Sequence, residues 1–320
     1  MTWLVTGGAG YIGAHVVRAL TAAGLDVVVL DDLSSGFAEF VPEGVPLVRG
    51  SILDQSLLEA TMAEHGVTGV VHVAGFKYAG VSVQRPLHTY EQNVTGTAVL
   101  LAAMAASGVD RIVFSSSAAV YGTPTTDLVT EATPTSPESP YGESKLIGEW
   151  LLRDQGIATG LRHVSLRYFN VVGSADVAIW DASAHNLFPL VFSALAEGRA
   201  PRINGDDYAT PDGTCVRDYI HVGDLAATHA AAALALDAGQ ALRSVYNLGS
   251  GDGVSVRQIM SAIARGTGID VEPEVGPRRV GDPARIVASG EAAARDLGWA
   301  ATHGLDAMVA SSWAAHGGRG

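Results

Sequence analysis

The chain has little positive charge and almost no cysteine. Its 320 residues contain 20 lysines and arginines against 33 aspartates and glutamates, a formal net charge of −13, and the sequence pI is about 5.1. Because a nucleic-acid interface needs a basic surface, we expect no nucleic acid as a partner. The single cysteine, Cys215, cannot form an internal disulfide, which fits a reducing compartment such as the cytoplasm.

The chain also lacks a long apolar run. One of the longest, residues 98–106, has nine residues, whereas a membrane-spanning helix needs about 18 or more. No basic segment followed by an apolar stretch opens the sequence, so we expect neither a secretory leader nor membrane association. With 48% hydrophobic and 17% charged residues, most of the chain is expected to fold.

Short β-branched runs alternate with longer helical patterns through the first 170 residues. The strand-like runs are residues 3–6, 27–30, 70–73, 111–114 and 164–167, and the helical patterns include 12–23, 56–65 and 94–106. This alternation predicts an α/β fold with a doubly wound parallel sheet of the Rossmann type, covered by helices on both faces. The first four runs are almost continuously apolar, as expected of buried parallel strands.

The regular rhythm ends near residue 170. Beyond it, stretches rich in Gly, Pro and Asp, such as 204–214 and 273–283, mix with short helical patterns. We therefore predict a dinucleotide-binding domain over residues 1–170 and a smaller, mixed substrate domain over residues 171–320, part of which returns to the first domain. No low-complexity linker separates the two, so we expect a shared cleft.

A glycine-rich turn follows the first strand-like run and opens the first helical pattern. Gly7, Gly10 and Gly13 are spaced three residues apart. Glycine there permits a tight turn, close approach of the backbone to a pyrophosphate and close helix–strand packing, and the helix N-terminus favours phosphate charge. Asp31 ends the second strand-like run, where a carboxylate binds ribose hydroxyls and repels a 2′-phosphate, so NAD is predicted rather than NADP. Asp32 either shares this role or caps the turn.

Tyr141 and Lys145 stand one helical turn apart, after a proline-rich turn. The chain has two lysines, Lys77 and Lys145, beside eighteen arginines, so a chance pairing of this kind is rare. Positions i and i+4 share a helix face, and a tyrosine beside a cation loses its proton more easily. Tyr141 is therefore a candidate base that takes a proton from a sugar hydroxyl while hydride leaves the same carbon. The alternative is a packing tyrosine beside a solvated lysine.

Three serines, residues 115–117, end the strand-like run that precedes this pair. Hydroxyls at the carboxyl end of a parallel strand face the ligand crevice. One of the three is expected to orient the substrate hydroxyl and relay its proton to Tyr141. The alternative is turn and cap chemistry, which serine also favours.

Together these motifs resemble the extended short-chain dehydrogenase/reductase family and, within it, the UDP-glucose 4-epimerases. The matching segments are 6–13, 74–77, 115–122, 141–145, 167–170, 212–222, 246–249 and 278–282. The resemblance implies a homodimeric, NAD-dependent isomerase that interconverts UDP-glucose and UDP-galactose. In such enzymes C4 is oxidised, the 4-keto sugar turns over in the pocket, and hydride returns to the opposite face.

The resemblance also implies a role for each matching residue. Tyr141 is the base, Lys145 lowers its pKa and binds the nicotinamide ribose, and Ser117 contacts the substrate hydroxyl. Beside Tyr141 and Lys145, the implied NAD-binding residues are Gly7, Gly10, Tyr11, Ile12, Gly13, Asp31, Asp32, Ser51, Ile52, Ala74, Lys77, Gln92 and Phe169. The implied UDP-sugar-binding residues are Ser117, Asn170, Asn186, Arg217, Arg279 and Asp282. For Arg217, pairing with Asp218 or another acid is the alternative.

Four places depart from the family pattern. Ser51 replaces an aspartate and Gln92 an asparagine, both near the cofactor. Val81 replaces a glutamate, and residues 175–185 do not match the family's approach to Asn186. Because the last two lie near the sugar, a 4-epimerase of a UDP-N-acetylhexosamine, UDP-uronate or UDP-pentose stays open.

Two other functions compete with this interpretation. A nucleotide-sugar 4,6-dehydratase normally has an Asp-Glu pair after the active-site hydroxyl, where this chain has Ala118 and Ala119. Neither alanine can transfer a proton. A non-catalytic NAD-sensing module would be expected to lose Tyr141 or Lys145, and both are present.

Overall fold

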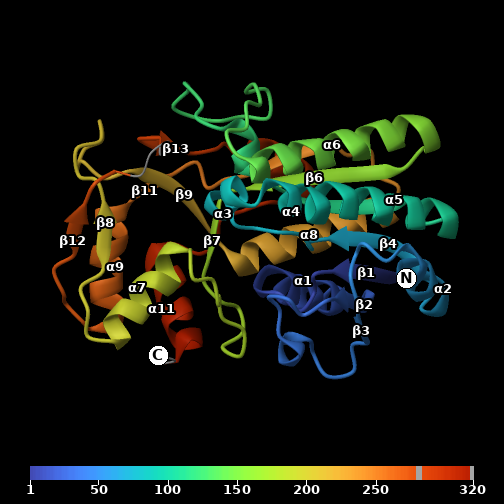
Figure 1. The fold of residues 1–320 in the computed structure, drawn as a ribbon, viewed down its shortest axis with the longest axis horizontal. Coiled ribbons are helices and arrows are strands. Elements are labelled where there is room, and N and C mark those ends of the chain that lie inside the picture. Colours follow the sequence, from blue (N-terminus) through green and yellow to red (C-terminus); the bar gives the residue numbers. More distant parts are fainter. Residues whose placement is uncertain (279–282, 318–320) are drawn as a thin grey trace.

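The computed structural model describes residues 1–278 and 283–317. A larger part with a central sheet and a smaller part with short strands lie side by side (Figure 1). The N-terminus belongs to the larger part, whereas the last labelled helix, α11 (Leu305–His316), belongs to the smaller one.

The larger part is organised around a parallel sheet of seven strands in the order β10-β6-β5-β4-β1-β2-β3. Its strands are β1 (Thr2–Thr6), β2 (Asp26–Asp31), β3 (Leu47–Arg49), β4 (Val67–His72), β5 (Arg111–Ser117), β6 (Arg162–Tyr168) and β10 (Val245–Leu248). After β3 the chain crosses back over β1 to begin β4. At such a reversal the carboxyl ends of parallel strands open a ligand crevice. The predicted doubly wound sheet is confirmed.

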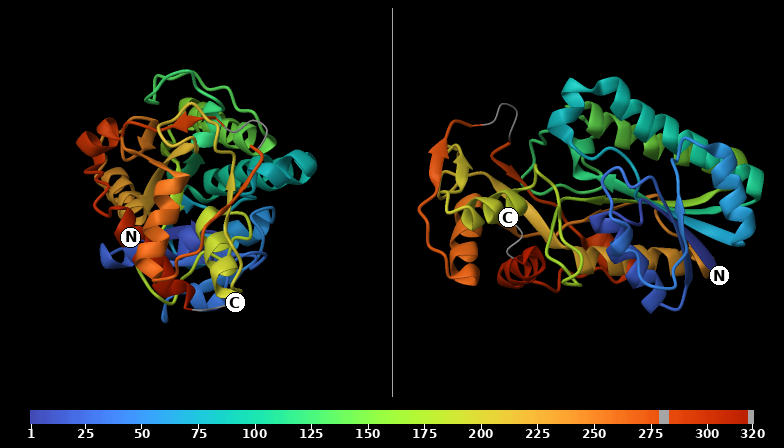
Figure 2. Two further views of the ribbon diagram at one scale, coloured as in Figure 1. Left: turned by 90° about the vertical axis from the view of Figure 1, so that its left-hand side faces the viewer. Right: turned by 60° about the horizontal axis from the view of Figure 1, so that its bottom comes forward.

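Helices cover both faces of this sheet (Figure 2). One layer contains α1 (Tyr11–Ala22), α8 (Val222–Asp237) and α10 (Glu291–Leu297), and the other contains α2 (Gln55–Glu64), α5 (Gly96–Ser107) and α6 (Pro140–Thr159). Successive side chains of a strand point to opposite faces. Trp3 and Val5 of β1 therefore enter the first core, and Leu4 enters the second.

Local sequence fixes the start of α6, which carries the predicted Tyr141 and Lys145. The side chain of Ser139 caps the helix by accepting a hydrogen bond from the Gly142 N–H at 3.2 Å, and Pro140 occupies the first turn. Both residues are favourable at these positions. Tyr141 consequently lies in the first turn of α6, above the carboxyl end of β5.

Short helical segments connect the main elements. They are the 3-10 turns η1 (Ala38–Phe40) and η3 (Ala118–Tyr121), the helices α3 (Ala79–Gln84) and α4 (Pro86–Tyr90), and the π-helical η2 (Glu91–Thr95). π-Helical turns occur frequently at functional sites.

The smaller part contains short strands and three helices. Its elements are β7 (Asn170–Val172), α7 (Leu187–Ala196), β8 (Arg202–Asn204), β9 (Val216–His221), β11 (Gly253–Ser255), α9 (Val256–Thr267), β12 (Glu274–Gly276), β13 (Arg285–Ile286) and α11. Strand β9 is central, because β7 and β13 pair with it in parallel and β11 pairs with it in antiparallel. A separate core forms between these strands and α7, α9 and α11.

The second half of the chain also contributes elements to the larger part. Helix α8 follows β9 directly and packs on α1, β10 forms one edge of the large sheet, and α10 packs on β10. Across residues 1–278 and 283–317, none of the helices combines the length and apolar character needed to cross a membrane.

Candidate active site

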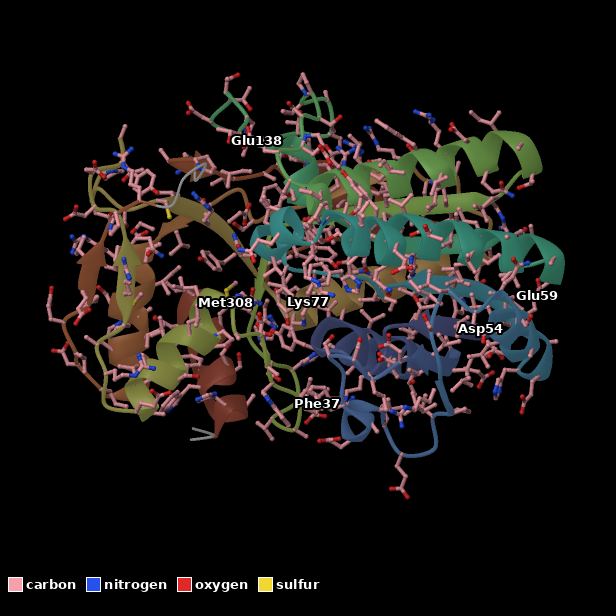
Figure 3. The ribbon with its side chains drawn as sticks, in the orientation of Figure 1. Phe37, Asp54, Glu59, Lys77, Glu138 and Met308 are labelled. Carbon is pink, nitrogen blue, oxygen red and sulfur yellow. The ribbon has the colours of Figure 1, made fainter. Side chains whose placement is uncertain are left out.

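A cleft of about 1100 Å³ lies between the two parts of the molecule. One wall comes from the carboxyl ends of β1, β2 and β4 and from α6, and the other comes from α7, β8 and β9. Lys77 lies where the two parts meet, and Met308 lies well inside the smaller part (Figure 3).

The glycine turn between β1 and α1 is closely packed. Gly7 has φ +74°, and a Cβ there would lie 2.7 Å from the backbone nitrogen of Ala74. A Cβ at Gly13 would lie 2.0 Å from the carbonyl oxygen of Gly7. Helix α1 begins at Tyr11 after Gly10, which offers no side-chain cap to the first N–H groups. The turn therefore presents bare backbone and a helix N-terminus to the cleft, a geometry that suits a pyrophosphate.

Asp31 ties this turn to the end of β2. Its carboxylate accepts hydrogen bonds from the N–H groups of Ala9 at 2.9 Å and Leu33 at 2.8 Å. Burial raises the pKa of Asp31, while these two hydrogen bonds lower it. The side chain lines the cleft together with Asp32, whose carboxylate accepts from the Ser34 N–H. Asp32 thus caps its turn as well as lining the cleft.

Tyr141 and Lys145 both line the cleft, as predicted. The Lys145 Nζ atom lies 5.9 Å from the centre of the Tyr141 ring and donates a hydrogen bond to the Ser115 carbonyl at 2.8 Å. Burial raises the pKa of Tyr141, and a hydrogen bond with Ser117 lowers it. Burial lowers the pKa of Lys145 to about 8, and the Glu149 carboxylate raises it. The structure therefore brings all three predicted catalytic residues together.

On the opposite side, three predicted substrate-binding residues line the cleft. The Asn170 amide donates to the Asp218 carbonyl at 3.0 Å, and the Asn186 amide donates to Asp181 at 2.7 Å. Arg217 Nη1 donates to the carbonyls of Val216 at 2.9 Å and Pro283 at 2.7 Å.

The alternative partner proposed for Arg217 has other contacts. The Asp218 carboxylate accepts from Ser250 and from the Ala288 N–H. Arg279 and Asp282 lie outside the described residues.

The other predicted cofactor residues mostly line the cleft. They are Gly7, Gly10, Tyr11, Ile12, Gly13, Ile52, Ala74, Lys77, Gln92 and Phe169. Ser51 is not among the lining residues, and its hydroxyl accepts from the Leu53 N–H at 3.2 Å. The Tyr11 hydroxyl donates to the Gly173 carbonyl at 2.5 Å, so this side chain joins the turn to the start of the second half.

Comparisons with known proteins agree with this geometry. Residues 3–249 match the NAD dependent epimerase/dehydratase family. The chain belongs to this family. The UDP-glucose 4-epimerase of Azospirillum brasilense is 45% identical over 317 residues, which cover 97% of this chain and 91% of that protein.

Solved structures of this family give the same result. The UDP-glucose 4-epimerase of Brucella ovis in complex with NAD is 40% identical with a TM-score of 0.93, over 98% of this chain and 97% of that one. The enzyme of Bifidobacterium longum in complex with NAD+ and UDP is 38% identical with a TM-score of 0.90, over 99% and 98% of the two chains. The predictions of an NAD-dependent enzyme and of the epimerase resemblance are confirmed.

Asn93 supports the lining of the cleft, and sequence reasoning missed it. It is buried in η2, where its amide oxygen accepts from the Phe76 N–H at 2.6 Å and its amide nitrogen donates to the Phe76 carbonyl and to Ser144 Oγ, both at 2.9 Å. It therefore fastens the loop that carries Lys77 to helix α6. A π-helical turn has no reliable sequence signature, and an asparagine before an apolar run resembles an ordinary cap.

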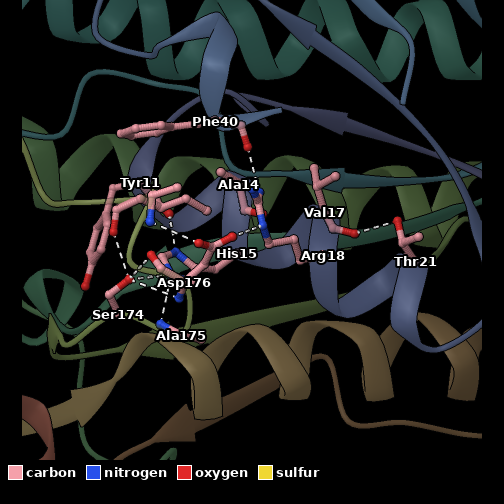
Figure 4. A network of polar contacts seen from close by, with 12 residues as sticks. Tyr11, Ala14, His15, Val17, Arg18, Thr21, Phe40, Ser174, Ala175 and Asp176 are labelled. Carbon is pink, nitrogen blue, oxygen red and sulfur yellow. Dashed lines mark hydrogen bonds and ion pairs between the residues drawn. The ribbon is translucent and has the colours of Figure 1, made fainter. Parts of the chain in front are cut away.

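The segment that departs from the family pattern has its own anchors. The His15 ring accepts from the Ala175 N–H at 3.1 Å, and Arg18 forms an ion pair with Asp176 at 2.8 Å (Figure 4). Trp180 packs against Phe40, with ring centres 4.7 Å apart. The segment thus lies along α1 and η1 and brings Asp181 and His185 to the cleft, which the sequence pattern did not indicate.

Proposed function

We propose that this chain interconverts UDP-glucose and UDP-galactose by oxidising and re-reducing C4 of the hexose. The observation that carries the proposal is the convergence of Ser117, Tyr141 and Lys145 beside a glycine turn that suits a dinucleotide. The similarity to UDP-glucose 4-epimerases over nearly the whole chain supports the choice of sugar nucleotide.

The residues present fit NAD. Gly7 and Gly13 would let the backbone of the turn approach the pyrophosphate. Asp31 would bind the adenosine ribose, and Lys145 and Phe169 would hold the nicotinamide side. When bound, NAD+ supplies a hydride acceptor and a positively charged ring near Tyr141. The Asp31 carboxylate repels a 2′-phosphate, which favours NAD over NADP.

Tyr141 acts as the base in the first half-reaction. Its phenolate oxygen takes the 4-OH proton, with Ser117 orienting the hydroxyl, as the hydrogen on C4 leaves with its electron pair. Lys145 stabilises the phenolate because its ammonium lies on the same helix face, 5.9 Å from the centre of the Tyr141 ring. In the second half-reaction Tyr141 returns the proton to O4 of the turned-over 4-keto sugar.

The smaller part holds the nucleotide, and the hexose is held loosely. Asn186, Arg217, Arg279 and Asp282 bind UDP, while Asn170 contacts the sugar side. A remote anchor of this kind leaves the 4-keto hexose free to rotate between the two half-reactions. We therefore assign NAD binding to residues 1–170 with α8, β10 and α10, and UDP-sugar binding to the rest of 171–320.

We further propose a homodimer in the cytoplasm. Helix α6 exposes Trp150 and Ile157, which are seven residues apart and share one helix face. Leu87 of the neighbouring α4 is 82% exposed. An apolar set of this kind fits a second copy of the chain better than solvent. The lone, buried Cys215 fits a reducing compartment.

The proposal is tested by incubating the purified chain with UDP-galactose and following the products by NMR, first without and then with added NAD. UDP-glucose should form, and Tyr141→Phe should lower turnover by about 10³-fold or more while still binding NAD. The chain could instead fail to convert UDP-galactose but turn over UDP-N-acetylglucosamine, UDP-glucuronate or a UDP-pentose. That result would assign a different UDP-sugar as the substrate. If none of these UDP-sugars is turned over, the epimerase proposal is wrong and a non-catalytic NAD-binding role is the alternative.

A further inference from the structure

Three consecutive serines end β5, and each has a different partner. The Ser115 carbonyl accepts from Lys145, and its hydroxyl is 2.9 Å from His229 Nε2. Ser117 bonds to Tyr141. Ser116, between them, points to the opposite face of the strand and donates to Glu149 Oε1 at 2.6 Å. The carboxyl end of β5 is therefore held from both faces.

Glu149 and Arg167 form a buried ion pair beneath this strand end. Arg167 lies opposite Ser116 on the neighbouring β6 and binds both Glu149 oxygens, at 2.8 Å and 2.5 Å. The two side chains are 7% and 6% exposed. Arg167 also donates to the Tyr121 hydroxyl at 2.8 Å, which in turn donates to Asn247 at 2.7 Å.

A buried pair of this kind is not explained by stability alone. Removing two charges from water costs about as much as their attraction returns, and well-packed apolar residues serve a core equally well. The pair is also placed to act on the active site, because Glu149 follows Lys145 by one turn of α6, and its carboxylate influences that ammonium.

We propose that the buried Glu149–Arg167 pair is a positioning element of the active site, which fixes the end of β5 beneath Tyr141 and Lys145 and balances the charge beside them. The inference rests on the proposed function and deepens it. Glu149 supplies negative charge near Lys145, and Arg167, which binds both Glu149 oxygens, offsets that charge. Removing either partner leaves the other charge uncompensated.

Three of the other titratable groups around Lys145 and Tyr141 keep one charge state near neutral pH. Burial lowers the pKa of His72 on β4 to about 3 and that of His229 on α8 to about 4, so both rings stay neutral. Burial raises the pKa of Tyr168 on β6, which stays a phenol. Burial also lowers the pKa of His163, which Glu149 partly offsets. The titration of Lys145 and Tyr141 is thus expected to change when the charge of the Glu149–Arg167 pair changes.

The test compares Glu149→Gln, Arg167→Gln and the double variant. In the NAD-loaded protein, the ultraviolet absorbance of tyrosinate is titrated from about pH 6 to about pH 10, with Tyr141→Phe subtracted to assign the signal. Glu149→Gln should move the ionisation midpoint down by on the order of one pH unit, because Arg167 is left positive. Arg167→Gln should move it up, by less, since Glu149 can take up a proton. The double variant should stay near the wild-type midpoint.

Turnover of UDP-galactose provides the second readout. Loss of positioning should lower kcat about tenfold in all three variants, with little change in KM. A purely structural pair would move both midpoints in the same direction or neither, and that result overturns the proposal. If the single variants do not fold, the double variant alone decides. An unchanged kcat of the double variant overturns the proposal, whereas a reduced kcat with a wild-type ionisation midpoint supports it. The titration needs no turnover, so a failure of the proposed function would be seen separately.

Discussion

The two walls of the cleft differ in how much of their surface is backbone and how much is side chain. On the proposed cofactor side, the surface around the glycine turn consists of backbone from that turn, the start of α1 and the end of β2. On the proposed sugar-nucleotide side, the cleft is lined by Asn186 at a helix terminus, Arg217 on a short strand and Asp181 in a loop. The glycine turn of the first wall is set by steric exclusion. The second wall is set by hydrogen bonds from its side chains to another side chain and to backbone carbonyls.

This difference explains how each wall tolerates change. A backbone surface cannot adapt to an added methyl group, because the nearest atoms belong to the main chain. A side-chain surface can lose one contact and keep the rest. The cofactor wall should therefore respond to single substitutions with larger effects than the substrate wall.

The largest effect should come from Gly13→Ala. The added Cβ would lie 2.0 Å from the Gly7 carbonyl oxygen, so the turn must open and NAD affinity should fall about 100-fold. Calorimetric titration of NAD into the NAD-free protein measures this. Gly304→Ala is the matched control, because a Cβ there meets nothing within 4 Å. Equal affinities for the two variants would refute the steric account.

A second prediction concerns how helix α8, from the second half of the chain, supports strand β5. His229 of α8 is buried against Ser115, and burial lowers its pKa to about 4. The unfolded state therefore binds more protons below pH 6.5, and stability present at neutral pH is lost as the pH falls from about 6.5 toward 4. His229→Gln should reduce the loss of unfolding free energy between pH 7 and pH 5 by about 2 kcal/mol.

Urea unfolding at the two pH values checks this prediction. His65→Gln, at the end of α2, serves as the control. A wild-type protein and a His229→Gln variant with the same pH dependence would show that the ring is not held neutral in the fold.

Asp31→Asn should have a smaller effect on the cofactor wall. The Ala9 and Leu33 N–H groups bind different oxygens of the Asp31 carboxylate, so the amide keeps an acceptor for only one of them. It also loses the charge that repels a 2′-phosphate. We expect NAD affinity to fall about tenfold and the preference for NAD over NADP to shrink by more than that. Asp32→Asn, at an exposed position, should change the preference much less. An unchanged ratio of the two affinities would argue against the role of Asp31.

The smallest effect should come from the substrate wall. Asp181→Ala removes the acceptor that holds the Asn186 amide, and KM for UDP-galactose should rise about threefold with kcat unchanged. Asp270→Ala, an exposed position away from the cleft, is the control. A loss as large as that of Gly13→Ala would mean that the two walls do not differ as described.

The strands and the glycine turn of the cofactor wall could be predicted from the sequence because the rules that govern them are local. The apolar runs became β1, β2, β4, β5 and β6, and the glycine spacing and Asp31 correspond to backbone geometry that few other residues permit. Two strands of the large sheet were missed. Strand β3 has three residues at the sheet edge, and β10 comes from the second half, so neither shows a long apolar pattern.

The rest of the site depends on contacts between distant segments. Asn93 supports the site because η2 lies against Phe76 and Ser144. Glu149 supports it because β6 places Arg167 beside its carboxylate. Asp181 reaches the cleft because Trp180 and Asp176 anchor its segment on η1 and α1. None of these relations follows from residue spacing, since each requires the packed fold.

The central claim is that the hydrogen on C4 leaves and returns as hydride within one active site. UDP-galactose carrying deuterium at C4 should be converted in ordinary water, and the UDP-glucose formed examined by NMR and mass spectrometry. Our account predicts that deuterium is retained at C4, because the hydride is stored inside the enzyme and returned to the opposite face. Replacement of the deuterium by solvent hydrogen would contradict it and indicate proton abstraction from C4 instead.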